Sequence, residues 1–401
     1  MVATAMVATA CGSSAANSGS SPTGDTVTVG EATALSGAVA DFGQTGLNGI
    51  KLAVDDINAQ GGLLGKKVKV KSADTAAKPD RGATSVRSMI LDDKAAALFG
   101  PVSSAVGAAE EAVAAARHVP IFFYVSNDVG LMNQHYTKYG FQLVPNTVME
   151  PQAIARAMAD KVGGKTVKLA TITPDYSFGR DTVSAFLDAL RKDGVKFTVT
   201  TQQTPPLGSS DLSSYISALI ASNPDYVFVG QYSGDLVTFT KQAAGFGLFS
   251  KTKVLANYDY GTLKALGSQA PVGAMAWDRA PFWAMPAVAK FTTRYHDKYG
   301  DYPSEWAIMG YTAVQTWAQG VKRANSFGAD KVSAALSGGA TVSTIRGHLT
   351  LRGCDHQAQI PEYVGTVAAS GNPQYGGAQL WGPSVFTAKS DQILPPCKNG
   401  G

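Results

Sequence analysis

Residues 26–62 read TVTVGEATALSGAVADFGQTGLNGIKLAVDDINAQGG, a short β-rich run that passes into a helical pattern. Residues 26–30 predict a strand, and residues 45–59 predict a helix that Gly61 and Gly62 end. The apolar side chains of that helix recur at helical spacing and share one face: Leu47, Ile50, Val54 and Ile57. A strand followed by a helix with one apolar face is the repeating unit of a parallel α/β sheet.

The alternation of strand and helix continues along most of the chain. Further strands are expected at residues 67–71, 95–99, 119–125 and 141–144, with helices at 81–91 and 104–117. After residue 144 the rhythm begins again, with helices expected at 151–161, 181–192, 212–221 and 235–244, and strands at 167–173, 196–200, 226–229 and 253–256. This pattern predicts an α/β fold of two doubly wound parallel-sheet lobes.

The last third of the chain predicts how the lobes are connected. A helix-rich block at 287–337 follows the second series, and short strands are expected near 341–345, 363–368 and 380–386. A return to helices suggests that the chain recrosses between the lobes. We expect a signal remnant, lipobox and flexible tether in residues 1–24, a first lobe from 25–144 plus 278–347, and a second lobe from 145–277 plus 348–401.

Composition narrows the class of protein. The 401 residues are 45% hydrophobic and 16% charged, enough to bury the cores of two domains of roughly 150 residues each. The net charge of +4 comes without a block of like charges, which argues against a nucleic-acid-binding surface. No apolar stretch reaches the length of about 18 residues that predicts a membrane-spanning helix.

The N-terminal residues predict a compartment. Residues 1–10, MVATAMVATA, are small and apolar and lead into Cys11, and residues 12–24 carry no charge. This order resembles the end of a bacterial lipoprotein signal, so the sequence predicts lipidation of Cys11 and an extracytoplasmic protein anchored to the cell membrane. Ala8 stands where Leu is usual, and the basic n-region is missing. The alternative is a free cysteine on a frayed tail.

Two other cysteines, Cys354 and Cys397, complete the set of three. In an exported protein such a pair forms a bridge more often than a metal site, and no histidine lies at ligand spacing from either. The sequence therefore predicts a Cys354–Cys397 disulfide and no metal.

Polar and aromatic clusters follow the ends of several expected strands. They lie in residues 99–104, 124–128, 174–179, 230–234 and 257–260, and the first of them contains Ser103 and Ser104 at the start of a helix. Ligands of doubly wound sheets bind at the carboxyl ends of the strands, where helix N-termini offer free N–H groups. Helix capping by the serines and wall packing by the aromatic residues are the alternatives.

Signatures of catalysis are absent from the sequence. It contains no G-x-S-x-G, no G-x-x-x-x-G-K-[ST], no H-E-x-x-H and no G-x-G-x-x-G after the first strand. The histidines are scattered, and the paired aspartates at 55–56 and 92–93 fit solvent-facing helix surfaces. We therefore predict no enzyme activity, no catalytic residue and no cofactor.

The opening of the chain also carries a resemblance to a known family. Leu35-Ser36-Gly37, Phe42-Gly43 and residues 55–65, DDINAQGGLLG, resemble the corresponding stretch of the branched-chain amino-acid-binding branch of the periplasmic substrate-binding proteins of ABC importers. Residues 175–179, DYSFG, and 310–313, GYTA, are similar as well. The resemblance covers the chain from Thr26 to about Phe386.

This resemblance implies a fold, a function and a site. The fold would be the type I periplasmic binding protein fold, in which three hinge crossovers join two lobes that close on a small ligand and deliver it to an ABC permease. A monomer is expected. From the first lobe Ser103, Ser104, Ser126 and Asn127 would hold a ligand carboxylate, and from the second Tyr176, Phe178, Tyr232, Tyr258 and Asp259 would complete the site.

The resemblance leaves the ligand open. Phe178 stands where many relatives have a tyrosine, and Asp259 is only a candidate partner for a ligand ammonium group. A branched-chain amino acid is the first expectation, and an aromatic acid or another small carboxylate is the alternative. A lipid-anchored sensor with the same fold would carry the same sequence features.

Overall fold

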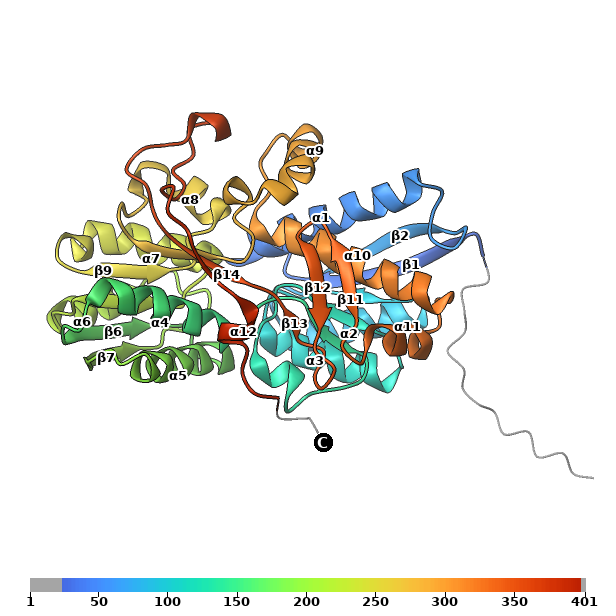
Figure 1. Ribbon diagram of the computed structural model, residues 1–401, viewed down its shortest axis with the longest axis horizontal. Coiled ribbons are helices and arrows are strands. Elements are labelled where there is room, and N and C mark those ends of the chain that lie inside the picture. Colours follow the sequence, from blue (N-terminus) through green and yellow to red (C-terminus); the bar gives the residue numbers. More distant parts are fainter. Residues whose placement is uncertain (1–23, 398–401) are drawn as a thin grey trace, which may run out of the picture.

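The computed structural model describes residues 24–397 and shows two lobes side by side (Figure 1). The first lobe contains five parallel strands in the order β2-β1-β3-β4-β5. Its strands are β1 (Thr26–Thr33), β2 (Lys67–Asp74), β3 (Leu98–Phe99), β4 (Ile121–Phe123) and β5 (Gly140–Gln142), and the helices between them are α1 (Ala40–Ala59), α2 (Pro79–Leu91) and α3 (Ser104–Ala116). Helices connect the parallel strands, as the alternating pattern predicts.

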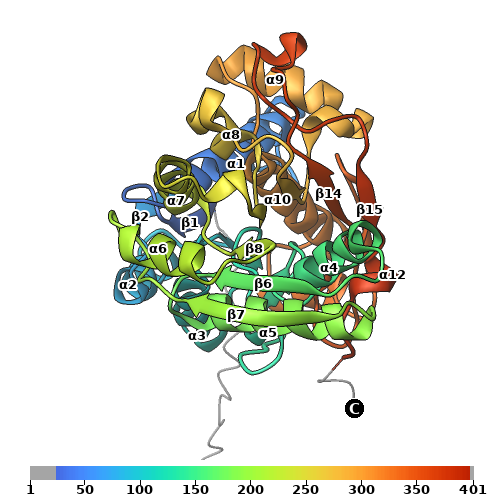
Figure 2. The same cartoon turned by 90° about the vertical axis from the view of Figure 1, so that its left-hand side faces the viewer.

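The second lobe contains a sheet in the order β15-β14-β10-β9-β8-β6-β7, part of which faces the viewer in Figure 2. Its parallel strands are β6 (Val167–Ile172), β7 (Phe197–Gln203), β8 (Tyr226–Val229), β9 (Lys253–Ala256) and β10 (Met275–Asp278). The antiparallel edge is formed by β14 (Glu362–Thr366) and β15 (Phe386–Ala388). The helices are α4 (Met149–Val162), α5 (Ser177–Lys192), α6 (Ser213–Ala221), α7 (Ser233–Gly245), α8 (Tyr260–Leu266) and α12 (Ser390–Ile393).

Between β10 and β14 the chain returns to the first lobe. It forms α9 (Ala289–Tyr299), α10 (Glu305–Ala324), α11 (Ala329–Leu336) and a small antiparallel sheet of β11 (Thr341–Thr344), β12 (Gly347–Leu351) and β13 (Ala358–Gln359). Helix α10 packs closely along α1, where a Cβ at Gly49 would overlap the carbonyl oxygen of Ala307. Glycine at this position therefore allows the two helices to approach each other.

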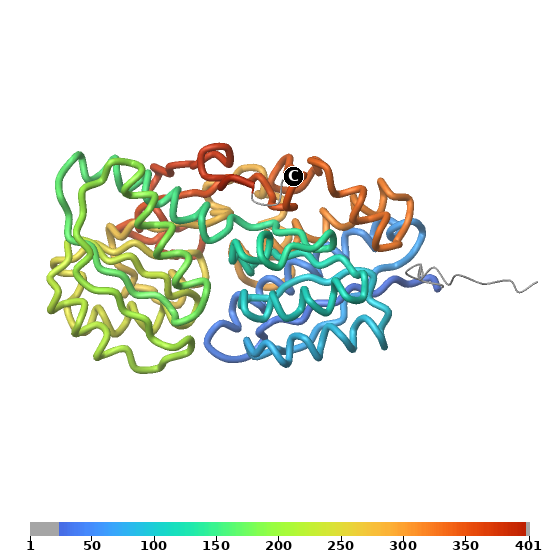
Figure 3. Tube along the Cα trace, turned by 90° about the horizontal axis from the view of Figure 1, so that it is seen from below, coloured from blue at the N-terminus to red at the C-terminus, as the bar shows by residue number. Residues whose placement is uncertain are grey.

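Within residues 24–397 the chain passes between the lobes three times, after β5, after β10 and after β13 (Figure 3). The predicted fold class is therefore confirmed. The third crossing lies later than the predicted boundaries place it. Residues 348–359 are assigned to the second lobe by that prediction, but β12 pairs with β11, β13 pairs with β12, and Gln357 forms a bridge with Gln142 of β5. Short antiparallel strands carry no signal of the sheet they join, so their lobe could not be read from sequence.

The start of α1 also differs from the expectation. The helix begins at Ala40, whereas a start at residue 45 is predicted from the apolar spacing. The additional turn carries Phe42, whose ring lies 4.5 Å from that of Trp306 on α10. Packing against α10 therefore extends the helix beyond its own apolar pattern.

No helix in the described part of the chain has the length and apolar character needed to cross a membrane. Cys11, the predicted lipidation site, lies outside residues 24–397. Cys354 and Cys397, with Cα atoms 6.4 Å apart, are bonded through their sulfur atoms. This bond ties the C-terminal segment to the loop between β12 and β13.

We expect both of these cysteines to resist alkylation in the native full-length chain until a reductant is added, as peptide mapping would show. In a Cys11→Ser background, replacing Cys354 and Cys397 by serine should lower the free energy of unfolding by about 4 kcal/mol, because the bridge closes a long loop. Rapid labelling of either cysteine without reductant would contradict the bridge.

Candidate functional site

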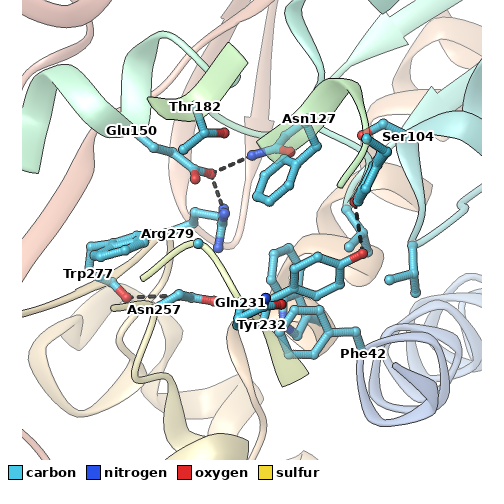
Figure 4. Close-up of a pocket in the computed structure, with 16 residues that line it drawn as sticks. Phe42, Ser104, Asn127, Glu150, Thr182, Gln231, Tyr232, Asn257, Trp277 and Arg279 are labelled. Carbon is cyan, nitrogen blue, oxygen red and sulfur yellow. Dashed lines mark hydrogen bonds and ion pairs between the residues drawn. The ribbon is translucent and has the colours of Figure 1, made fainter. Parts of the chain in front are cut away.

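A cavity lies between the lobes, at the carboxyl ends of strands from both sheets (Figure 4). The residues that line it come from both lobes: Phe42, Val102, Ser104, Val125, Asn127, Glu150, Tyr176, Phe178, Thr182, Gly230, Gln231, Tyr232, Asn257, Trp277, Arg279 and Trp306. This is the position at which ligands bind in doubly wound sheets.

The first lobe contributes polar groups from the ends of β3 and β4. Ser104 is the first residue of α3, a position where backbone N–H groups are free of helical partners, and its Oγ accepts a hydrogen bond from the Asp128 N–H (3.3 Å). Asn127 follows β4, and its Nδ2 donates to Glu150 Oε1 (2.8 Å). Both side chains are buried in the closed arrangement.

The second lobe contributes an aromatic wall. Tyr176 and Tyr232 directly precede α5 and α7, and their hydroxyl oxygens lie 2.8 Å apart in a hydrogen bond. The Phe178 ring lies edge-on to Tyr232 (5.5 Å between centroids). Burial raises the pKa of both tyrosines above the ordinary value, so both hydroxyls remain protonated.

Contacts across the mouth of the cavity hold the lobes together. The Ser177 Oγ of α5 donates to Asp128 Oδ2 of the first lobe (2.6 Å), and the Gly234 N–H donates to the Ala38 carbonyl (2.9 Å). The rings of Phe42 and Tyr232 stack across the same boundary, 5.9 Å apart. The described arrangement is therefore a closed one.

A buried guanidinium completes the cavity. Arg279, which follows β10, forms ion pairs with Glu150 of α4 and with Glu305 of α10. Its backbone N–H donates to Glu305 Oε2 (2.6 Å), and its guanidinium lies over the Trp306 ring at 4.5 Å. Among residues 24–397, Arg279 is thus the only cation that lines the cavity, and carboxylates from both lobes hold it in place.

The predicted site residues divide into two groups in the structure. Ser104, Asn127, Tyr176, Phe178 and Tyr232 line the cavity together. Ser103, Ser126, Tyr258 and Asp259 are not among the lining residues.

Three residues of the second group have side-chain partners outside the cavity. Ser126 Oγ donates to the Pro101 carbonyl (2.6 Å), and the Tyr258 hydroxyl lies 3.1 Å from Thr240 Oγ1 in the core. Asp259 Oδ1 accepts from the Thr262 N–H (2.9 Å) and so caps α8. Their geometry is that of supporting residues.

Sequence reasoning missed the charged part of the site. Glu150 lies beyond the first crossing and Arg279 at the second, and neither belongs to a motif. Trp277 and Trp306 were also missed, since both read as ordinary core residues. A signal was present for Asp278 and Arg279, because charged residues directly after a buried strand need partners.

Possible metal ligands within residues 24–397 group only at Cys354, Asp355 and Cys397. The two sulfur atoms of that group are bonded to each other, so they are not free to bind an ion. The cavity itself holds no such group of ligands among the described residues.

The fold and the cavity define a two-lobed binding protein. The periplasmic binding protein family model matches residues 26–372, and the chain belongs to that family. The resemblance to the branched-chain amino-acid-binding proteins is thereby confirmed.

Individual relatives agree with this assignment. Leu/Ile/Val-binding protein homolog 7 of Brucella abortus (strain 2308) is 26% identical over 335 residues, which cover 79% of this chain and 82% of the relative. A periplasmic binding protein from Burkholderia mallei has a TM-score of 0.84 and 26% identity, covering 94% of this chain and 98% of the other. A solute-binding protein of an ABC transporter from Rhodopseudomonas palustris BisB5, in complex with 3,4-dihydroxybenzoic acid, has a TM-score of 0.80 and 23% identity, covering 91% and 98%.

The pH dependence of stability tests whether Asp259 is a buried residue that caps α8. Burial raises the pKa of its carboxyl from 3.8 to about 7, with Glu305 adding to the effect. Between these two values the unfolded chain loses the proton and the folded chain keeps it, so Asp259 lowers stability as the pH rises from about 4 to about 7.

The Asp259→Asn variant retains a capping group but lacks this titration. Relative to the unsubstituted chain, its free energy of unfolding should rise by up to about 4 kcal/mol between pH 4 and pH 8, as denaturant titrations would measure. An equal difference between the two proteins at both pH values would show that Asp259 does not titrate in this range.

Proposed function

We propose that this protein is the extracytoplasmic solute-binding component of an ABC importer, and that it binds a small carboxylic acid with an apolar body between its lobes. The cavity between the lobes carries the proposal, because groups of both lobes line one enclosed space. A solute that contacts both lobes favours the closed state and shifts the population toward it. The solute is then handed to the permease without chemical change.

The cavity walls support an acid with a flat or bulky apolar part. Aromatic rings form much of the lining: Phe42, Tyr176, Phe178, Tyr232, Trp277 and Trp306. On the first-lobe side, Ser104 and the free N–H groups of α3 offer hydrogen bonds to a carboxylate. Such a site recognises one polar group at one end and excludes water from the rest of the ligand.

The carboxylates near the cavity favour an aromatic or aliphatic acid over an amino acid. Glu150 and Glu305 both pair with Arg279, so neither is free to receive a ligand ammonium group. The relative from Rhodopseudomonas palustris that holds 3,4-dihydroxybenzoic acid lends further support. A branched-chain amino acid is the second candidate, because the Brucella abortus relative is a Leu/Ile/Val-binding protein homolog.

We also propose that a lipid attached to Cys11 anchors the protein. Several acyl chains on one cysteine would give stable anchoring, which a single chain does not. The uncharged residues 12–24 would then act as a tether with a reach of roughly 20 Å. A lipid-anchored sensor would use the same cavity and the same anchor.

A panel of solutes tests the ligand class. We expect benzoate, 3,4-dihydroxybenzoate or a branched aliphatic acid to raise the melting temperature of the full chain, because a ligand at about 100 times its dissociation constant adds about 2.7 kcal/mol of stability. Trp277 and Trp306 line the cavity, so their fluorescence should report the same binding. Stabilisation by neutral sugars alone would overturn the proposed class, and stabilisation by isoleucine alone would favour the second candidate.

Two adjacent serines supply a matched pair of variants. Ser104 lines the cavity and Ser103 does not, although both are equally buried. Ser104→Ala should weaken binding of the acid found in the panel by about 1 kcal/mol, or roughly fivefold, through loss of a hydrogen bond. Ser103→Ala should leave the affinity measured by calorimetry unchanged. Equal losses in the two variants would argue against a ligand contact at Ser104.

A further inference from the structure

A cluster of buried charged residues lies beside the cavity and extends into the crossings between the lobes. It contains four carboxyl groups and two guanidinium groups: Glu150, Asp278, Glu305, Glu362, Arg279 and Arg346. Asp278 and Arg279 lie at the second crossing, and Glu362 begins β14 after the third. Of these residues, only Glu150 and Arg279 line the cavity.

Glu305 is the fixed partner of Arg279. Its Oε2 accepts from the Arg279 backbone N–H (2.6 Å), and its Oε1 accepts from Arg279 Nη1 (2.8 Å) and from Asn257 Nδ2 (3.2 Å). These three donors require an acceptor, which is what an ionised carboxylate provides. Three hydrogen bonds therefore hold Glu305 in place as a counter-ion of Arg279.

Asp278 and Glu362 supply the surplus carboxyl groups. Among residues 24–397, neither oxygen of Glu362 has a hydrogen-bond partner, and Asp278 Oδ2 has none. Burial raises the pKa of both side chains well above the ordinary value, and the neighbouring carboxylates add to the effect. An unpartnered buried carboxylate is costly, so both groups are neutral.

Among the six residues of this cluster, the remaining charges are balanced before a ligand enters. Two ionised glutamates, Glu150 and Glu305, stand against Arg279 and Arg346, and the Arg346 Nη2 donates to the Arg279 carbonyl (2.6 Å). A ligand that enters as an anion would add one uncompensated negative charge to an enclosed space. An uncompensated charge in surroundings of low polarity costs free energy. The nearest group that can compensate it is Glu150, which loses its own negative charge when it takes up a proton.

Groups from every neighbouring element face Glu150. Arg279 at the end of β10 pairs with it, and Asn127 of the first lobe donates to it. Glu305 of α10 repels it, and the neutral Glu362 of β14 lies close to it. Burial raises the pKa of Glu150 to about 7, against the opposing effect of Arg279. The side chain can therefore gain or lose a proton near neutral pH.

We propose that Glu150 takes up one proton from solvent when a carboxylate anion enters the cavity, so that anion and proton bind together. The net charge of the enclosed space is then the same with and without the ligand. Arg279 keeps its ion pair with Glu305. The ligand carboxylate replaces the Glu150 carboxylate as the second partner of Arg279. This inference rests on the proposed function, and it makes Glu150 a specificity-determining residue that admits monoanionic acids.

Calorimetry of the full chain with benzoate, an anion throughout the range from pH 6 to pH 9, tests the proposal. Titrations at pH 8 in phosphate and in Tris, which differ in ionisation enthalpy, should show uptake of about one proton per benzoate bound. The dissociation constant should rise about tenfold per pH unit above pH 7, following the ionisation of Glu150. These measurements need no variant.

Two variants locate the titrating group. Glu150→Gln mimics the protonated side chain and still offers an oxygen to Asn127, so at pH 8 it should bind benzoate about tenfold more tightly than the unsubstituted chain, with an affinity that is constant from pH 6 to pH 9. Asp259→Asn is the matched control, because Asp259 is buried, has a pKa raised to about 7 and does not line the cavity. It should retain the pH dependence in full.

The possible failures are distinguishable. Benzoate binding without proton uptake, or a pH dependence that persists in Glu150→Gln and disappears in Asp259→Asn, would overturn the inference and leave the proposed function standing. If benzoate, 3,4-dihydroxybenzoate and the branched aliphatic acids of the panel all fail to bind at any pH, the proposed ligand class fails and the inference fails with it.

Discussion

The buried guanidinium of Arg279 is the constraint on which the arrangement of the lobes depends. A charge removed from water must be compensated by partners with good geometry, and removal of one partner of such a pair costs about 3 to 5 kcal/mol. Here the partners come from both sides of the molecule: Glu150 begins the second lobe on α4, and Glu305 begins α10 of the first. Arg279 lies at the second crossing and also lines the cavity. A change of charge in the cavity therefore acts on the ion pairs that join the lobes.

The contacts at the mouth of the cavity are of a different kind. They are single hydrogen bonds, from Ser177 to Asp128 and from Gly234 to Ala38. Each contributes about 1 kcal/mol, too little to lock the lobes together against thermal motion without a ligand. The ion pairs of Arg279 thus hold the lobes together more strongly than the hydrogen bonds across the mouth of the cavity. This difference suits a protein that must release its solute, since the affinity for the solute can then decide whether the lobes stay closed.

Much of the site was accessible from the sequence because it follows from the topology of parallel sheets. The loops after β3 and β4 leave the first sheet at its carboxyl edge, and the loop after β8 leaves the second sheet at the corresponding edge, so Ser104, Asn127 and Tyr232 could be named in advance. Ser103 and Ser126 were named by the same reasoning, but their side chains take neighbouring positions outside the lining. A shift of one residue changes the direction of a side chain, and loop sequences alone do not fix that direction.

The class of fold follows from the amino-acid sequence, because the alternation of short buried strands with one-sided apolar helices has few other solutions. The sequence also identifies the family, through residues 35–65. Only the tertiary structure decided which charges meet at the hinge, because Glu150, Arg279 and Glu305 are far apart in sequence and belong to no local pattern. They pair because the folded chain brings the first two crossings against the start of α10.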